Sequence, residues 1–459
     1  MKARKLLSGV LAGVFCLSFL SYLPVQAEDY WPSGPEVQSG AAVVMEVSTG
    51  TVLYEKNSHE QLYPASITKI MTTMLALENC SLDEEVTFSH DAVYSIDHDS
   101  SNIYRDEGEI LTMEQSLYAV MLASANDCAY AVAEHAGKGY ENFISMMNDK
   151  AAQLGCTDTH FNNPHGLPDT DHYTSAYDMA LISRAAMQND IFRLITGTKK
   201  YTIPVTNKHP NEETHFVNHH KMLTNYQGDT TYLYDHCIGG KTGYTDSARN
   251  TLVTFAEKDG MILVCVIMKS DPVSQYKDTR SLLDYCYDNF TMWNVSENAS
   301  AYQVDGIANT EMFGNTGSFV DLDREGRIVL PKTAAFGDAA CEIIEKPEDT
   351  AVVAVMEYTY ADRVVGSVNI QRTNTRIESY TFGSMSESQE EEKTVLKIKV
   401  EYIIIGVAVL VALALLGLLI FYLANNFYII RHKIRSRKKE KSKFKTIKSG
   451  KHTKWHTRW

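Results

Sequence analysis

The sequence is poor in cysteine and lacks the cysteine spacings that mark metal or disulfide frameworks. Eight cysteines are spread over 459 residues, and no Cys-x-x-Cys pair occurs. Seven remain once the N-terminal leader with Cys16 is removed: Cys80, Cys128, Cys156, Cys237, Cys265, Cys286 and Cys341. A chain of this length folds without disulfides, so we expect most of them to be buried small apolar residues. We predict no zinc centre and no cofactor.

Positive charge is also scarce outside the two ends of the chain. The chain carries −14 at pH 7, and its ends hold +3 and +12, which leaves the part between near −29. A surface this acidic repels phosphates, so we predict no nucleic-acid partner. No internal repeat is present either, which excludes a repeat architecture.

The N-terminus has the three parts of a secretory signal peptide. A basic start precedes an apolar run over residues 6–20, and Val25-Gln26-Ala27 places small residues where a signal peptidase reads them. We therefore predict a signal peptide over residues 1–27. The alternative is an uncleaved N-terminal anchor.

A second apolar run, residues 402–423, has the length of a membrane span. It contains no charged residue, and at helical rise it covers ~30 Å, the thickness of a bilayer core. The tail, residues 424–459, has thirteen Lys or Arg against one acid, and basic tails stay in the cytoplasm. We predict a single-pass cell-membrane protein that contacts lipid through this helix, with its C-terminus cytoplasmic and its N-terminal bulk outside. An acidic, polar stretch before the span, residues 384–401, is predicted to be a flexible stalk.

The part between the ends is predicted to form two domains. The first, residues 28–293, has α+β character. Strand patterns over 41–47 and 51–56 are followed after Pro64 by helical patterns, among them 113–122, 125–136 and 140–154. Strand patterns over 250–257 and 261–269 then flank Asp259-Gly260, and a helical pattern covers 279–292. This order suits one antiparallel sheet shared by both ends of the domain and covered by helices. The second, residues 294–383, reads as a small β-rich domain with strands such as 351–356 and 363–370.

Three short motifs carry the chemistry of the first domain. They are Ser66-Ile67-Thr68-Lys69, Ser124-Ala125-Asn126 and Lys241-Thr242-Gly243. Each motif alone is weak, because Ser100-x-Asn102 and other stretches match the same patterns. Their order and placement are informative: the first two open helices and the third lies on a strand, as in penicillin-binding proteins and class A β-lactamases.

These residue types suit nucleophilic catalysis on an acyl group. A serine hydroxyl needs a neighbour that takes its proton, and Lys69 is on the same helical face as Ser66. Lys69 can act only if burial and a nearby cation, Lys241, lower its pKa. We predict Ser66 as nucleophile, Lys69 as base and Ser124 as proton relay to the leaving amine.

The remaining motif residues are predicted to bind substrate. Asn126 would orient Lys69 and the substrate amide, while Lys241 and Thr242 would hold a carboxylate. Gly243 would let the substrate backbone approach the strand. The backbone N–H groups of Ser66 and Tyr244 would form the oxyanion hole.

At these residues the sequence resembles the low-molecular-weight penicillin-binding proteins, the serine D-Ala-D-Ala carboxypeptidases. The resemblance includes Tyr63-Pro64-Ala65-Ser66-Ile67-Thr68-Lys69, Ser124-Ala125-Asn126-Asp127, the segment 161–169 with His172-Tyr173-Thr174-Ser175-Ala176, and Lys241-Thr242-Gly243-Tyr244-Thr245. It implies a β-lactamase/transpeptidase-like domain with helices around a five-stranded antiparallel sheet, followed by an all-β domain. The implied activity removes the terminal D-Ala from peptidoglycan stem peptides through a penicillin-sensitive acyl-enzyme, in cell-wall biogenesis or remodelling.

Two departures and three alternatives accompany this resemblance. Arg249 stands where the family usually has glycine, and a full span replaces the amphipathic C-terminal helix of many relatives. A class A β-lactamase needs a glutamate-bearing loop to activate the water that hydrolyses its acyl-enzyme. A β-lactamase-like hydrolase is therefore disfavoured, because no glutamate occurs between Gln153 and Glu212. A non-catalytic wall-binding scaffold is disfavoured because Ser66 and Lys69 are both present. A metal site at His215, His219 and His220 is disfavoured because no acid lies between them as in His-Glu-x-x-His.

Overall fold

The computed structural model describes residues 30–97, 99–298, 320–346 and 351–372, all within one compact unit, residues 1–376. The predicted signal peptide, stalk, apolar run 402–423 and basic tail lie outside these residues. Among the helices that are described, none is long and apolar enough to cross a membrane.

A five-stranded antiparallel sheet forms the centre of the first domain, as the sequence predicts. Its order is β2-β1-β9-β8-β7, with bounds β1 (Ala41–Glu46), β2 (Val52–Lys56), β7 (Cys237–Thr245), β8 (Arg249–Lys258) and β9 (Met261–Ser270). Strand β1 pairs with β9 in a continuous register from Ala41↔Met268 to Glu46↔Leu263. The two ends of the domain therefore meet in one sheet, and β7 is left at an edge.

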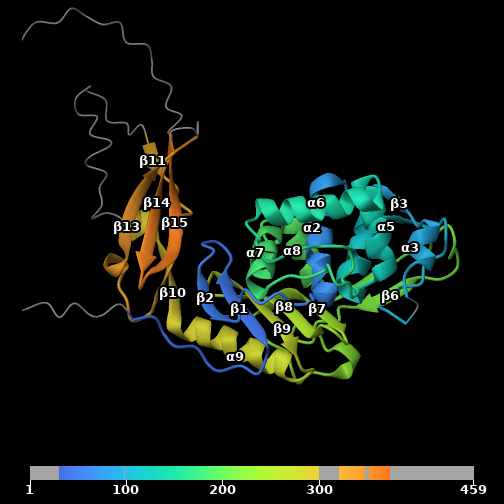
Figure 1. Cartoon of the computed structure of the whole chain (residues 1–459), viewed down its shortest axis with the longest axis horizontal. Helices are drawn as coiled ribbons and strands as arrows, with labels where there is room; N and C mark the ends of the chain where they lie inside the picture. The colour runs from blue at the N-terminus through green and yellow to red at the C-terminus, as the bar shows by residue number, and fades with distance from the viewer. Residues whose placement is uncertain (1–29, 98, 299–319, 347–350, 373–459) are drawn as a thin grey trace, which may run out of the picture. The chain divides into compact units, whose positions relative to one another are not determined.

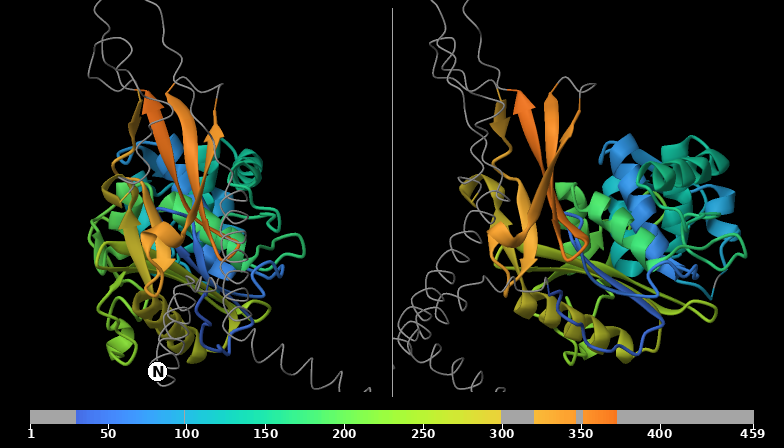
Figure 2. Two further views of the ribbon diagram at one scale, coloured as in Figure 1. Left: turned by 90° about the vertical axis from the view of Figure 1, so that its left-hand side faces the viewer. Right: turned by 60° about the vertical axis from the view of Figure 1, so that its left-hand side comes forward.

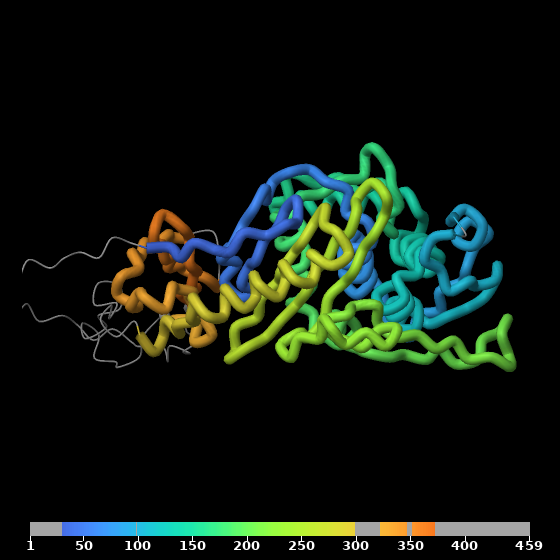
Figure 3. The backbone as a smooth tube through the Cα atoms, turned by 90° about the horizontal axis from the view of Figure 1, so that it is seen from below, coloured from blue at the N-terminus to red at the C-terminus, as the bar shows by residue number. Residues whose placement is uncertain are grey.

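Both faces of this sheet are apolar, because alternate residues of β1 and β9 point to opposite sides. Val43, Val264 and Val266 belong to the core shared with the helix cluster, whereas Val44 and Ile267 belong to the core under α9 (Ser274–Asn289). Figures 1 and 3 show the helix cluster on one face and α9 across the other. The near-continuous apolar strands 41–47 and 261–269 reflect this double burial.

The helix cluster contains the segments that were predicted to be helical between residues 64 and 154. It is built from η1 (Ala65–Thr68), α2 (Lys69–Asn79), α3 (His90–Tyr94), α4 (Met113–Tyr118), η2 (Ala119–Ala123), α5 (Asn126–Gly137), α6 (Tyr140–Gln153), α7 (Ala176–Ala186) and α8 (Asp190–Gly197). Two-stranded ribbons accompany it, namely β3 (Glu85–Thr87) with β4 (Ile110–Thr112) and β5 (Lys200–Ile203) with β6 (Thr214–Val217). A single turn of 3-10 helix, η3 (Tyr226–Gly228), precedes β7.

The residues after α9 form a separate β structure (Figure 2). Its four-stranded sheet has the order β11-β15-β14-β13, with bounds β11 (Val320–Leu322), β13 (Ala340–Glu345), β14 (Val352–Tyr360) and β15 (Arg363–Arg372). Strand β10 (Phe290–Asn294) pairs with β12 (Arg327–Pro331), and short turns of helix, α10 (Val295–Asn298) and η6 (Phe336–Asp338), complete it. This region has its own apolar core around Tyr358, Val365 and Val368.

One predicted element is partly wrong. The helical pattern over 279–292 ends early, because α9 stops at Asn289 and residues 290–294 form β10. The helix also starts earlier, at Ser274. Residues 290–294 instead pair with β12 as a strand. This tertiary pairing outweighs the helical periodicity of the local sequence.

Candidate active site

Ser66 lies where a turn of 3-10 helix leads into α2. Pro64 caps that turn and Ala65 has a positive φ of 51°, so the chain bends sharply just before the serine. Lys69, one helical turn later, is the first residue of α2 and is fully buried. Ser66 itself is half-buried and faces the pocket described below.

The ammonium group of Lys69 has three neighbours within hydrogen-bonding distance. Nζ lies 3.0 Å from Ser66 Oγ, 2.6 Å from Asn126 Oδ1 and 2.6 Å from the His165 carbonyl oxygen. Burial is the main cause that holds the pKa of Lys69 well below its usual value, and the charge of Lys241 adds to it. Lys69 therefore has access to the neutral form that a base requires.

These neighbours also fix the direction in which a neutral Lys69 would accept a proton. Asn126 Oδ1 and the His165 carbonyl can only accept hydrogen bonds, so they take the two N–H groups of a neutral amine. The lone pair is then left for Ser66, whose hydroxyl can donate along the 3.0 Å contact. The arrangement is suited to deprotonating the serine.

Asn126 and Ser124 are brought to the pocket by a break between two helical segments. Ser124 follows the π-type turn η2 and has a left-handed φ of 60°, and α5 begins at Asn126. Both residues line the pocket. In the described part of the chain, the Ser124 hydroxyl makes no hydrogen bond to Lys69 or Lys241, so its role as a proton relay stays a prediction.

The edge strand β7 carries the third motif along the pocket. Lys241 is buried, and burial lowers its pKa to about 7; its Nζ donates to the Thr242 carbonyl at 2.8 Å. Thr242 and Tyr244 line the pocket, with the Tyr244 side chain 56% exposed. A Cβ on Gly243 would lie 2.8 Å from the backbone nitrogen of Ser66. Glycine is thus needed for the close approach of β7 to the nucleophile.

The predicted residues surround one open cavity of about 380 Å³. Ser66, Ser124, Asn126, Thr242, Gly243 and Tyr244 line it, while Lys69 and Lys241 are buried behind its wall. The structure thus brings all eight predicted site residues together. Other residues that line it were not predicted: Asp99, Ser100, Ser101, Gly166, Leu167, His219, Lys221, Tyr226, Thr245, Asn250, Gln275 and Tyr276.

The segment 163–172 forms a strap against the first turns of α2. Lys69 and Thr72 donate to the carbonyl oxygens of His165 and Pro164, and His172 Nε2 lies 2.9 Å from Thr68 Oγ1. Gly166 has a φ of 88°, and a Cβ there would collide with the Ala65 carbonyl. The strap therefore places a backbone carbonyl, that of His165, against Lys69.

A second loop is held against the other side of Asn126. Ser101 O accepts from the Asn126 backbone N–H at 2.8 Å, and Asn126 Nδ2 donates to Ser100 Oγ at 2.9 Å. The pattern Ser100-x-Asn102, which in the sequence only showed that the second motif is weak by itself, thus belongs to the site. The one sequence feature that could have indicated it is that Ser100-Ser101-Asn102 matches the Ser-x-Asn pattern of the second motif.

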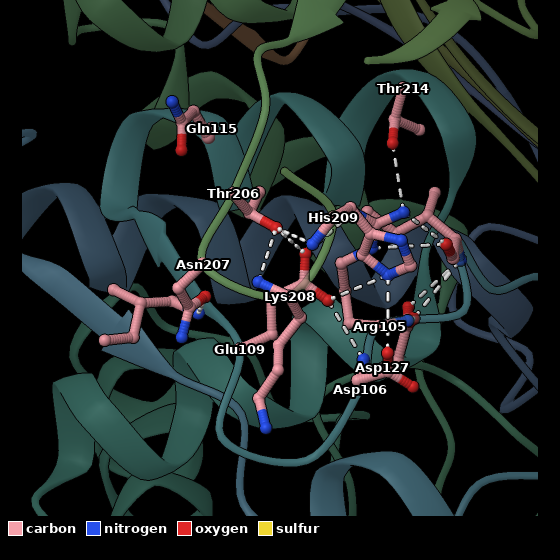
Figure 4. A network of polar contacts seen from close by, with 12 residues as sticks. Arg105, Asp106, Glu109, Gln115, Asp127, Thr206, Asn207, Lys208, His209 and Thr214 are labelled. Atoms are coloured by element: carbon pink, nitrogen blue, oxygen red, sulfur yellow. Dashed lines mark hydrogen bonds and ion pairs between the residues drawn. The ribbon is translucent and has the colours of Figure 1, made fainter. Parts of the chain in front are cut away.

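A buried polar network fixes that loop (Figure 4). The Asp127 carboxylate accepts from the backbone N–H groups of Ile103 and Arg105 at 3.2 and 3.3 Å. The Arg105 guanidinium pairs with Glu109 at 3.0 Å, with both side chains buried, and it also donates to Thr214 Oγ1 on β6. Asp127, next to Asn126, therefore positions the loop that contacts Asn126.

The remaining sequence predictions have clear places in the structure. Arg249 has a left-handed φ of 57° and does not line the cavity. His215 is exposed on β6, His219 lines the cavity, and His220 is buried, with Nε2 near the Val253 carbonyl and Thr254 Oγ1. Burial lowers the pKa of His219 and of His220 to about 4. The seven cysteines of the described residues are free thiols, and four of them are buried.

Comparisons with known proteins agree with this geometry. The profile of the D-alanyl-D-alanine carboxypeptidase family, peptidase family S11, matches residues 28–272. D-alanyl-D-alanine carboxypeptidase DacF of Bacillus subtilis is 33% identical over 293 residues, 62% of this chain and 72% of the relative. DacD of Escherichia coli is 29% identical over 351 residues, 72% of this chain and 83% of the relative.

Solved structures extend the likeness to the fold. The Streptomyces K15 DD-transpeptidase superposes with a TM-score of 0.52 and 29% identity, over 56% of this chain and all of that structure. Penicillin-binding protein 6B of Escherichia coli superposes with a TM-score of 0.54 and 25% identity, over 74% of this chain and 98% of that structure. The chain belongs to the D-alanyl-D-alanine carboxypeptidase family.

Proposed function

We propose that this chain is a serine-type carboxypeptidase that removes the terminal D-Ala from peptidoglycan stem peptides. The observation that carries this proposal is the contact of Ser66 with a buried lysine, whose other hydrogen bonds go to groups that can only accept. The family membership supplies the substrate class, and the open cavity beside Ser66 can admit a peptide end.

The acylation step follows from these contacts. Ser66 Oγ attacks the carbonyl carbon of the penultimate D-Ala while its proton passes to Lys69 Nζ. Backbone N–H groups of Ser66 and Tyr244 stabilise the negative oxygen. The C–N bond then breaks, and the leaving D-Ala amine takes a proton that Lys69 returns, with Ser124 as the proposed relay. Lys241 and Thr242 hold the terminal carboxylate.

Hydrolysis of the acyl-enzyme completes the reaction. Lys69, again neutral, takes a proton from a water molecule that attacks the Ser66 ester, and the ester oxygen recovers a proton as the bond breaks. The strap at residues 163–172 contacts Lys69 through the His165 carbonyl and not through a carboxylate that could activate water. A β-lactam that acylates Ser66 is thus expected to stay bound for long times, as an inhibitor.

Labelling with a fluorescent penicillin tests the nucleophile. The purified chain should take up one label per molecule, and peptide mapping should place the added mass on Ser66. Release of D-Ala from a stem peptide should stop in the labelled protein. Label on another residue, or labelling of Ser66→Ala, would show that the nucleophile is elsewhere.

We also propose that the protein is anchored in the cell membrane with its catalytic domain outside. The proposal is supported by the signal-peptide pattern of residues 1–27, the apolar run 402–423 and the basic tail. Protease added to intact, wall-stripped cells should remove the catalytic domain and leave an epitope at Trp459 protected. Loss of that epitope under the same conditions would reverse the topology.

A further inference from the structure

Three side chains from separate parts of the chain meet on the helix cluster, away from the catalytic residues. Cys80 is the residue that caps the C-terminus of α2, Glu84 precedes β3, and His135 lies in the last turn of α5. The thiol sulfur, a carboxylate oxygen and a ring nitrogen lie within 4.8 Å of one another. His135 Nε2 is 2.8 Å from Glu84 Oε2, and these two side chains are 29% and 42% exposed.

The cysteine spacing predicts no zinc centre, but these ligands come together only in the fold, and we propose that Cys80, Glu84 and His135 form a binding site for a zinc-like divalent cation. Thiolate, imidazole and carboxylate are the three side-chain ligands that zinc takes, and three protein ligands leave a fourth position for water. In a tetrahedral site neighbouring ligand atoms lie roughly 3.5 Å apart. Partly exposed side chains reach that spacing with shifts on the order of 1 Å, because His135 and Glu84 must separate slightly and Cys80 approach.

The helices around the cluster favour a cation. The last carbonyl groups of a helix carry partial negative charge, and the cluster lies at the C-terminal ends of both α2 (Lys69–Asn79) and α5 (Asn126–Gly137). Burial and the charge of Glu84 raise the pKa of the Cys80 thiol, so the cation itself must favour the thiolate. The nearby positive charge of Lys138 repels a cation, although it also favours the deprotonated forms of Glu84 and Cys80. A divalent cation with two anionic ligands leaves the site near neutrality.

The ligands are also oriented before any cation binds. Glu84 Oε1 accepts from the Ser81 backbone N–H at 2.7 Å, which fixes the carboxylate, and such contacts to ligands strengthen metal sites. The Cys80 sulfur makes no hydrogen bond within the described residues, so it is available. On binding, the S–H bond of Cys80 breaks, its proton goes to solvent, and the sulfur–metal bond forms. His135 Nε2 gives up the proton that it shares with Glu84, the neutral ring keeps its one N–H on Nδ1, and the freed Nε2 lone pair binds the metal.

A cation here would join the far ends of the two helices that begin with catalytic groups. Lys69 is the first residue of α2 and Asn126 the first of α5, and these two residues share the 2.6 Å contact in the active site. A metal at the opposite ends would fix the relative position of α2 and α5. The expected effect is greater stability of the helix pair, with the chemistry left to Ser66 and Lys69.

Cobalt(II) is a suitable spectroscopic probe, because a thiolate ligand gives a charge-transfer band that carboxylates and imidazoles do not. We expect the purified full chain to develop this band on titration with Co²⁺, and Zn²⁺ to displace it. Cys80→Ser should remove the band, and His135→Gln should weaken Co²⁺ binding about tenfold or more. Zn²⁺ at a hundred times its dissociation constant should raise the Tm by roughly 5 °C.

Cys156→Ser is the matched control, since Cys156 is also a partly exposed free thiol, with its sulfur on the Asp178 carbonyl. It should keep the band. All variants should retain penicillin labelling at Ser66, which shows that they are folded. Absence of the band from the unmodified chain, its persistence in Cys80→Ser, or unchanged affinity in His135→Gln would overturn the proposal.

Discussion

Lys69 and Lys241 are both fully buried, although the reaction requires them in different charge states. Lys69 must be neutral to take the proton of Ser66, whereas Lys241 must be charged to hold a carboxylate. The pKa of Lys241, about 7, leaves much of it charged at neutral pH, and that charge helps to keep the pKa of Lys69 low. The charged state of Lys241 therefore favours the neutral state that Lys69 needs.

Replacement of Lys241 should move the acid limb of the pH profile. In Lys241→Gln the neighbouring cation is gone, so the pKa of Lys69 rises and a higher pH is needed to make it neutral. The acid limb of the acylation rate constant should shift to higher pH. The measurement is the second-order rate of penicillin labelling between pH 5 and 10. Thr242→Ala removes no charge, so the acid limb of its acylation rate should remain at the pH of the unmodified chain. An acid limb that does not shift in Lys241→Gln would show that the charge of Lys241 does not lower the pKa of Lys69.

The role of Thr242 can be tested by the preference of the enzyme for substrates that end in a free carboxylate. Loss of one hydrogen bond to a charged group costs about 1.5–3 kcal/mol, or roughly 10- to 150-fold in kcat/KM. Thr242→Ala should lose this factor for a stem peptide ending in D-Ala-D-Ala and lose little for the same peptide amidated at its C-terminus. Lys69→Ala should acylate with neither. An unchanged preference in Thr242→Ala would mean that the carboxylate is held by other groups.

For single residues, the motifs predicted which side chains come together in the site, but most of the contacts between them could be seen only in the structure. The Ser66–Lys69 pair follows from helical spacing alone. The His165 carbonyl could not be predicted, because a backbone acceptor leaves no trace in residue type. Ser100 was not among the predicted site residues, since nothing in the sequence places residues 99–105 beside Asn126.

Among the elements, the β7–β8 turn has a residue type that does not suit its backbone conformation. Arg249, the first residue of β8, has a φ of 57°, a conformation that favours glycine. Strain of this kind costs about 1–3 kcal/mol in a residue with a side chain. The turn nevertheless keeps its register, with Thr245 opposite Arg249, because the β7–β8 ladder continues through Lys241.

Arg249→Gly should therefore stabilise the protein. The strain that is relieved exceeds the extra entropy lost by glycine on folding, so we expect a net gain of about 1 kcal/mol and a Tm rise of roughly 2–4 °C. Arg249→Ala is the matched control: it removes the charge and keeps the Cβ, so it should gain nothing. Penicillin labelling should be unchanged in both, since Arg249 does not line the cavity. Equal Tm values for the two variants would show that strain is not the cause.

Element boundaries were predictable where periodicity and packing agree. The predicted bounds differ by no more than one residue at each end for β8 (predicted 250–257), β9 (predicted 261–269) and α6 (predicted 140–154). The pattern over 113–122 conceals a change from α4 to the π-type turn η2. Sequence periodicity does not show that change, because the buried face is continuous. The α9–β10 boundary was missed because its cause is a pairing with β12, far along the chain.

At the scale of the molecule, buried histidines connect stability to pH. His172 is held neutral by two contacts: Nδ1 accepts from the Asn162 backbone N–H, and Nε2 faces Thr68 Oγ1. Burial is the main cause that lowers the pKa of His172 to about 3, and it lowers that of His220 to about 4. Both histidines support the site: His172 lies in the strap on α2, and His220, in the loop after β6, packs against β8 next to β7.

The sign of this effect is fixed by the direction of the shifts. An unfolded histidine takes up a proton below pH about 6.5, whereas the folded ones stay neutral until near pH 4 or 3. The unfolded state thus binds more protons between these values, so stability is full above about pH 6.5 and falls as the pH drops. Each such histidine should contribute about 1.4 kcal/mol per pH unit across that window.

The slope of unfolding free energy against pH, measured by urea denaturation between pH 6 and 4.5, tests this origin. Carboxylates also contribute to that slope, so the comparison is between variants. His172→Gln should be less stable than the unmodified chain at pH 7, yet its slope should be lower by about 1.4 kcal/mol per pH unit, because glutamine cannot titrate. His215→Gln, at a side chain exposed on β6, should keep the full slope. A slope that His172→Gln leaves unchanged would show that His172 is not a source of the acid sensitivity, which would then come from the carboxylates and the other buried histidines. The supporting strap would then have no part in the pH response.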